Sequence, residues 1–111
     1  MSVTPYLRTK KVSENLLASV DFRGRLDDGE LLTGTPTVVE VDTADLTFSN
    51  KRVSTGTLII NGQTVLTAQA VQVLIAGGVP GVQYEVRITV GSTSSPAQTF
   101  VEKLKIEVVE D

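Results

Sequence analysis

The chain of 111 residues contains no cysteine, no histidine and no tryptophan. The absence of cysteine excludes disulfide bonds, thiolate zinc sites, iron–sulfur clusters and cysteine nucleophiles. The absence of histidine removes the commonest general base and the commonest metal ligand. Because serine and threonine hydroxyls then have no imidazole to activate them, we expect a protein without enzyme activity, metal or cofactor.

Long hydrophobic runs are also missing, since the longest extends from Val73 to Ala76 and a transmembrane helix needs about 20 apolar residues. The first residues lack the apolar stretch of a signal peptide, so we expect neither membrane insertion nor secretion by that route. Lys and Arg total 10 against 13 Asp and Glu, a net charge of −3. This balance argues against nucleic-acid binding, which requires a basic face.

What the sequence does contain is apolar and polar residues in alternation, the pattern of half-buried β-strands. The alternation is clearest at residues 83–90 and 104–108. Shorter examples occur at residues 36–42, 46–48 and 71–75. Phe100 shares the parity of the last strand but Glu102 interrupts it, and we expect a β-bulge or a sheet edge there.

Turn signals separate these segments. Asn61-Gly62 joins residues 57–60 to 63–67 and predicts a hairpin with a type I′ turn. The glycine-rich segment 77–81 and the polar segment 92–96 predict loops, the second joining two long strands. Residues 15–23 fit a strand or one face of a helix, and we favour the strand because Phe22 lies on the strand face.

About seven short strands and no sustained helical period predict an all-β fold, an antiparallel β-sandwich. A small closed barrel is the alternative architecture. Residues 1–13 show no period, and we expect an extended N-terminal arm that becomes ordered on binding. The remaining residues, 14–111, form the single domain that this length allows.

Residues 78–90 resemble the penultimate strand of immunoglobulin-like and fibronectin type III sandwiches, in which a Pro-Gly turn precedes Tyr-x-Val-x-Ile. The resemblance places Tyr84 at the tyrosine corner, where the ring packs in the core and the hydroxyl bonds nearby backbone. It implies structural roles for Tyr84 and Val86, and we expect Phe22 to join them in the core.

A wider resemblance covers about residues 11–110. It rests on Lys11–Leu26 with the Asp28-Gly-Glu-Leu-Leu step, Leu46-Thr-Phe-Ser49, Gly77–Val86 and Glu102–Glu110. Together these segments resemble a group of short bacteriophage and prophage structural proteins, the fibre–tail adaptor and head–tail components. Phe22 stands where that group has Trp, and no second aromatic residue lies near Gly24 and Arg25.

The resemblance implies a virion structural protein that binds other tail, fibre or neck proteins and forms a homo-oligomeric ring, made in the host cytoplasm before assembly. Such contacts would use strand edges, the N-terminal arm and the glycine-rich loop. We therefore predict partner contacts at Tyr6, Leu7, Lys10, Lys11, Gly78 and Pro80.

Other functions fit fewer residues. The same sandwich also serves surface or secreted adhesion modules of the fibronectin type III kind, the alternative function. The acidic residues Asp27, Asp28 and Glu30 lack the ligand spacing of a calcium loop and predict a solvated turn. Asp42 and Asp45 flank a turn, which explains them better than an acid–base pair does. A small enzyme or hydrolase accessory would need a catalytic group that the composition lacks.

Overall fold

The computed structural model describes residues 6–111, which form nine β-strands and a 3₁₀-helix at Arg23–Arg25. The strands are β1 (Tyr6–Lys11), β2 (Leu16–Asp21), β3 (Leu32–Glu40), β4 (Leu46–Val53), β5 (Leu58–Ile60), β6 (Gln63–Val65), β7 (Ala70–Gly77), β8 (Gln83–Ser92) and β9 (Thr99–Val109). Among these residues, no helix is long and apolar enough to cross a membrane. The prediction of an all-β chain is confirmed.

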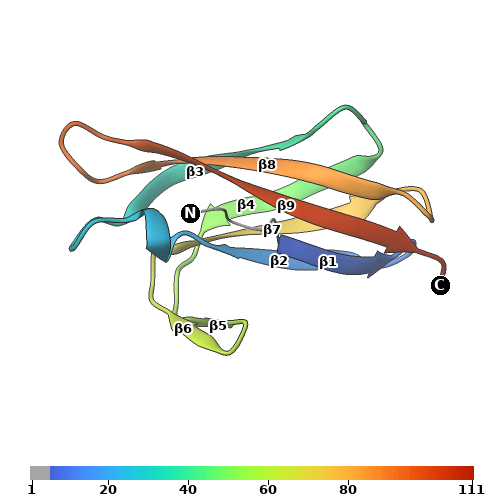
Figure 1. Ribbon diagram of the computed structural model, residues 1–111, viewed down its shortest axis with the longest axis horizontal. Coiled ribbons are helices and arrows are strands. Elements are labelled where there is room, and N and C mark those ends of the chain that lie inside the picture. Colours follow the sequence, from blue (N-terminus) through green and yellow to red (C-terminus); the bar gives the residue numbers. More distant parts are fainter. Residues whose placement is uncertain (1–5) are drawn as a thin grey trace.

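The strands form two main sheets and a separate hairpin (Figure 1). The larger sheet has the order β1-β9-β8-β3, the smaller has the order β2-β7-β4, and β5 pairs only with β6. Neighbouring strands are antiparallel except β1 and β9, which are parallel. The two open sheets lie as two layers of a β-sandwich rather than closing into a barrel, and the hairpin projects from them (Figure 1).

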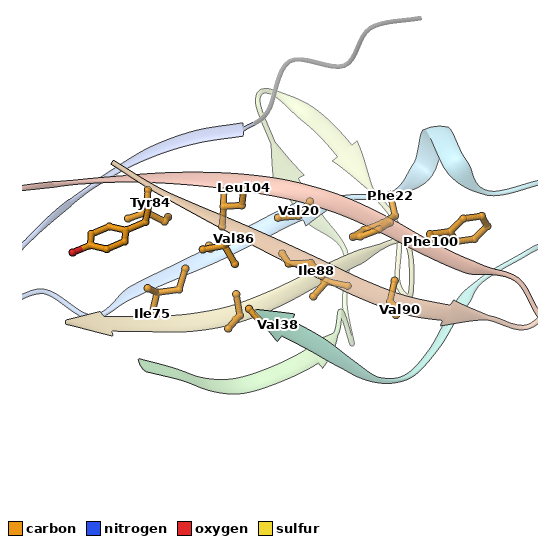
Figure 2. Close-up of a cluster of buried hydrophobic side chains, with 14 of the residues drawn as sticks. Val20, Phe22, Val38, Ile75, Tyr84, Val86, Ile88, Val90, Phe100 and Leu104 are labelled. Carbon is orange, nitrogen blue, oxygen red and sulfur yellow. The ribbon is translucent and has the colours of Figure 1, made fainter. Parts of the chain in front are cut away.

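One hydrophobic core fills the space between the sheets, built from the inward members of the alternating strands. β8 contributes Tyr84, Val86, Ile88 and Val90, and β9 contributes Phe100, Leu104, Ile106 and Val108. Figure 2 shows Tyr84 at one end of this row of side chains and Phe22 with Phe100 at the other. Each fully buried large aliphatic side chain stabilises the fold by about 1.5–3 kcal/mol.

The ambiguous segment at residues 15–23 is a strand, as we favoured. β2 buries Ala18 and Val20 while the side chain of Leu17 remains 43% exposed. This alternation satisfies a sheet with one buried face, whereas a helix would have placed Leu16, Leu17 and Val20 together. The chain then enters the short 3₁₀ turn, and Phe22 is fully buried at the junction.

The interruption at Glu102 is explained by a sheet edge. β8 and β9 pair in unbroken register from Gln83 to Gly91, so no bulge is present. β1 pairs with β9 only from Leu104 onward, which leaves residues 99–103 without a second described neighbour strand. Arg25 covers this edge by donating to the carbonyl of Val101 at 3.0 Å and to Glu102 Oε1 at 2.8 Å.

The segment at residues 1–13, which we expected to be an extended arm that becomes ordered on binding, joins the larger sheet in the part that the structure describes. Residues 6–11 form β1 and pair with Leu104–Val109 at the opposite end of the chain. Its sequence, YLRTKK, lacks the apolar alternation of a half-buried strand. Residues 1–5 lie outside the described part.

The Asn61-Gly62 turn is confirmed. Both residues have positive φ angles, 52° and 76°, as a type I′ turn requires. β5 and β6 pair around it in the predicted order, with Ile60 opposite Gln63.

Candidate partner-binding surfaces

The hydroxyl of Tyr84 connects three segments at one end of the sandwich. The Tyr84 ring is buried, and its oxygen accepts a hydrogen bond from the backbone N–H of Val79 at 2.7 Å. The same hydroxyl donates to Asp45 Oδ2 at 2.9 Å. Burial raises the pKa of the Tyr84 hydroxyl, and the carboxylate of nearby Asp45 adds to this shift. The residue therefore fixes the loop before β8 to the start of β4.

Gly77 and Gly78, at the start of the 77–81 loop, serve close packing. Gly78 has φ +101°, and a Cβ built there would lie 2.7 Å from Val108 Cγ2 and 3.2 Å from Leu46 Cδ2. Gly77 has φ +85°, and its Cβ would lie 2.8 Å from the carbonyl oxygen of Asp45. Side chains are thus excluded from both positions by conformation and by space. Gly78 is better explained by this packing than by the partner contact that we predicted.

Lys10 is fully buried, which contradicts its predicted place on a contact surface. Its Nζ donates to the carbonyls of Gly77 at 2.8 Å, Lys11 at 2.8 Å and Val12 at 3.0 Å. Lys10 lies opposite Val108 in the β1–β9 pair, so it shares the inward parity of the core. Its ammonium joins β1 to the end of β7, next to the Tyr84 corner.

The other predicted contact residues lie near the same end of the sandwich. Lys11 is exposed at the end of β1, and Pro80 is exposed in the loop beside Val79, whose side chain is 48% exposed. Tyr6 and Leu7 belong to the edge strand β1. The structure therefore brings Lys11 and the 79–81 loop to one end, while Lys10 and Gly78 lie beneath them.

Glu40 organises the neighbouring turn that contains Asp42 and Asp45. Its carboxylate accepts hydrogen bonds from the Thr43 hydroxyl and from the backbone N–H groups of Asp45 and Leu46. Burial alone would raise the pKa of Glu40, but these hydrogen bonds outweigh it and lower the pKa. The turn is thus held by Glu40, and Asp45 is free to accept from Tyr84.

Two arginines that the sequence did not single out position the opposite end of the molecule. Arg25 lies 5.5 Å from the centroid of the Phe100 ring and forms an ion pair of 2.8 Å with Glu102. Arg23 forms an ion pair with Asp21 and also donates to the β5–β6 hairpin. Asp21 is close to Arg23 in the sequence, but no local pattern identifies the other acceptors, which lie 40 or more residues away.

A comparison with protein-family models matches residues 10–105 to the podophage GP4 fiber-tail adaptor protein gp77 family. The match spans well over half of the chain. The chain belongs to this family. The comparison with curated proteins found no match, and neither did the comparison with solved structures.

The strand edges of this sandwich differ in how open they are to another strand. β3 changes register between Thr33 and Thr37 and contains Pro36, and β4 changes register between Ser49 and Arg52. Bulges, proline and charged residues protect sheet edges from pairing. β2, in contrast, keeps one register with β7 from Leu16 to Asp21, and no described strand pairs with its other side.

Proposed function

We propose that this protein is a non-enzymatic structural component of a phage tail that connects fibre and tail proteins through protein–protein contacts. The observation that carries the proposal is the family match over residues 10–105. The composition supports it, because a chain without histidine and cysteine lacks the usual catalytic groups. The protein would reside in the virion after passing through the host cytoplasm.

We further infer that the sandwich is immunoglobulin-like. In such domains one sheet holds strands C, F and G and the other holds B, E and D. Here β3, β8 and β9 correspond in order to C, F and G, while β2, β7 and β4 correspond to B, E and D. The hydrogen bond between the Tyr84 hydroxyl and the backbone of Val79, five residues upstream, supports the same assignment.

The proposed contacts lie at several places around the domain. Lys11 and Pro80 are exposed at one end, and Tyr6 and Leu7 lie in the edge strand β1. The regular edge of β2 has backbone groups that can accept a further strand by β-augmentation. Repetition of these contacts around the tail would give the homo-oligomeric ring, and neither nucleic acid nor membrane is among the proposed partners.

A stop codon in this gene of the parent phage tests the proposal. We expect the chain in purified wild-type virions by mass spectrometry and, in particles from the stop-codon phage, tails that lack fibres by electron microscopy. Supplying the chain from a plasmid should restore the fibres. Purified virions that lack the chain, or stop-codon particles with a normal number of fibres, would refute the proposal.

A further inference from the structure

The stretch from Val53 to Tyr84 contains no Asp, Glu, Lys or Arg, although 21% of the whole chain is charged. This stretch includes the buried strand β7, where the absence of charge is expected. It also includes the β5–β6 hairpin, which projects from the sandwich (Figure 1). Projecting elements are normally rich in charge, and depletion of charged residues is a compositional mark of protein–protein interfaces.

The hairpin is apolar on both of its faces. Its inner face packs Ile60, Val65 and the partly buried Leu58 against Ala70 in a small cluster of its own. On the outer face, the side chain of Ile59 is 69% exposed, and Leu66, the residue that follows β6, is 55% exposed. Ile59 pairs across the hairpin with Thr64, another exposed and uncharged residue. A two-stranded ribbon with a buried inner face therefore presents a second apolar face to the outside.

Arg23 holds this ribbon in a fixed orientation. Asp21 fixes the guanidinium through Nε and Nη2, at 3.0 Å and 2.9 Å from Oδ2. Arg23 then donates from Nη1 to the carbonyl of Thr64 at 2.8 Å and from Nη2 to Gln63 Oε1 at 3.0 Å. An element held in its binding geometry loses less conformational freedom on association, which strengthens binding.

Positive charge lies at the base of the hairpin. Lys51 and Arg52 are exposed at the end of β4, just before Ser54, whose N–H donates to Ala70 where the hairpin begins. Within residues 6–111, neither cation forms an ion pair. Unpaired cations beside an uncharged surface favour a partner with carboxylates at the matching rim.

We propose that the β5–β6 hairpin inserts into an uncharged, apolar groove bordered by carboxylates on another protein of the particle. Ile59 and Leu66 would fill the groove, while Lys51 and Arg52 would pair with the rim. This inference rests on the proposed adaptor function and names the chemistry of one of its partners. Burying an uncharged face against charged side chains would leave those charges desolvated and unpaired, so the groove must itself be uncharged.

The larger sheet of a second copy of this chain is a poor occupant. The outer face of its larger sheet carries a mixture of charges, with Glu85, Arg87, Lys103, Lys105 and Glu107 on β8 and β9. Docking the hairpin there would remove these groups from water without replacing their hydration. Self-association through the hairpin is therefore an outcome that would contradict the proposal.

Particles from the stop-codon phage provide the binding probe. Co-sedimentation with them would measure the dissociation constants of the wild-type chain and of Ile59→Asp and Leu66→Asp. We expect both variants to bind at least about tenfold more weakly. Val39→Asp is the matched control, since Val39 is 46% exposed on β3 outside the hairpin, and its affinity should stay within about twofold.

Three further measurements keep the outcome interpretable. Circular dichroism and urea midpoints should show that the aspartate variants fold as the wild type does. In a chain without natural cysteine, Thr64→Cys should react with a thiol reagent in the free protein and be protected on the particle, while Thr37→Cys should remain reactive. The double change Lys51→Glu with Arg52→Glu should weaken binding and reduce its salt dependence.

The possible failures are distinguishable. If the wild-type chain does not bind the fibreless particles at all, the adaptor function is wrong. If it binds and both aspartate variants bind equally well, only the assignment of the hairpin is wrong. Wild-type dimers in native mass spectrometry that Ile59→Asp dissociates would identify a second copy as the occupant and overturn the proposal.

Discussion

Lys10 is stabilised inside this sandwich without a carboxylate in hydrogen-bonding contact. An ammonium has three N–H donors, and the Nζ of Lys10 places them on three backbone carbonyls, of which Gly77 belongs to the neighbouring sheet. The charge is thus satisfied by three peptide dipoles, and the carbonyl of Lys11 also accepts from the backbone N–H of Glu14. The residue acts as a cross-link between β1 and β7.

Replacing Lys10 by Met should therefore destabilise the fold although it introduces an apolar residue into the core. The carbonyls of Val12 and Gly77 would lose this donor, whereas the carbonyl of Lys11 also accepts from the backbone N–H of Glu14. An unsatisfied buried polar group costs about 1–3 kcal/mol. Lys11→Met is the control, because Lys11 is exposed and should change the free energy of unfolding by at most about 0.5 kcal/mol. Urea unfolding measures both, and a Lys10→Met variant as stable as wild type would contradict this role.

Glu30 gives the fold a dependence on acid pH. The backbone N–H of Asp27 lowers the pKa of the Glu30 carboxyl, with further help from Ser92, Ser94 and Gln98, although desolvation opposes the shift. A carboxyl whose pKa is lower in the folded state stabilises the fold above its ordinary pKa, about 4.5 here. That contribution is lost as pH falls through the lower folded value.

Glu30→Gln should consequently be less stable than wild type at pH 7 but lose less stability between about pH 5 and pH 3. Urea unfolding at several pH values measures the two slopes. Equal slopes for variant and wild type would show that Glu30 does not contribute to the acid sensitivity of the fold.

At the scale of elements, the loop between β7 and β8 must approach the core closely. Gly78 and Gly81 both have positive φ, +101° and +88°, but of the two only Gly78 has neighbouring atoms within contact distance of an added Cβ. Comparing substitutions at the two glycines therefore distinguishes the strain of the backbone conformation, present at both, from the clash with Val108 and Leu46, present only at Gly78.

Gly81→Ala should cost about 1–2 kcal/mol from backbone strain alone. Gly78→Ala should cost about 1–3 kcal/mol more, because the added methyl overpacks the core. Thermal or urea unfolding of both variants measures the difference. Equal destabilisation would mean that Val108 and Leu46 move aside without cost.

Elements that depend on local sequence signals could be predicted, and elements that depend on distant parts of the chain could not. The strands β8 and β9 and the Asn61-Gly62 turn were predictable because alternation and turn chemistry are local signals. β1 was not, because its partner β9 lies at the other end of the chain and its residues lack alternation. The burial of Lys10 and the contacts of Arg23 follow from tertiary structure. They could not be predicted because a charged residue in a segment without apolar alternation is ordinarily exposed.

At the scale of the whole molecule, stability should be unevenly distributed. The two sheets share one large core, whereas the β5–β6 hairpin has a cluster of three buried residues and pairs with neither sheet. Local opening is easiest where few buried apolar contacts hold a segment. A hairpin that inserts into a partner would combine such marginal stability with a fixed orientation. Arg23 holds the orientation of the β5–β6 hairpin.

Hydrogen exchange should reveal this division. Backbone amides of β5 and β6 should exchange faster than those of β7 and β8, and Arg23→Ala should accelerate exchange in the hairpin by about tenfold. Arg25→Ala is the matched control, because Arg25 contacts Val101 and Glu102 on β9 and should leave hairpin exchange unchanged. If Arg23→Ala instead accelerated exchange equally in β8, the hairpin and the sandwich would open as one unit, and Arg23 would stabilise the whole fold rather than orient the hairpin.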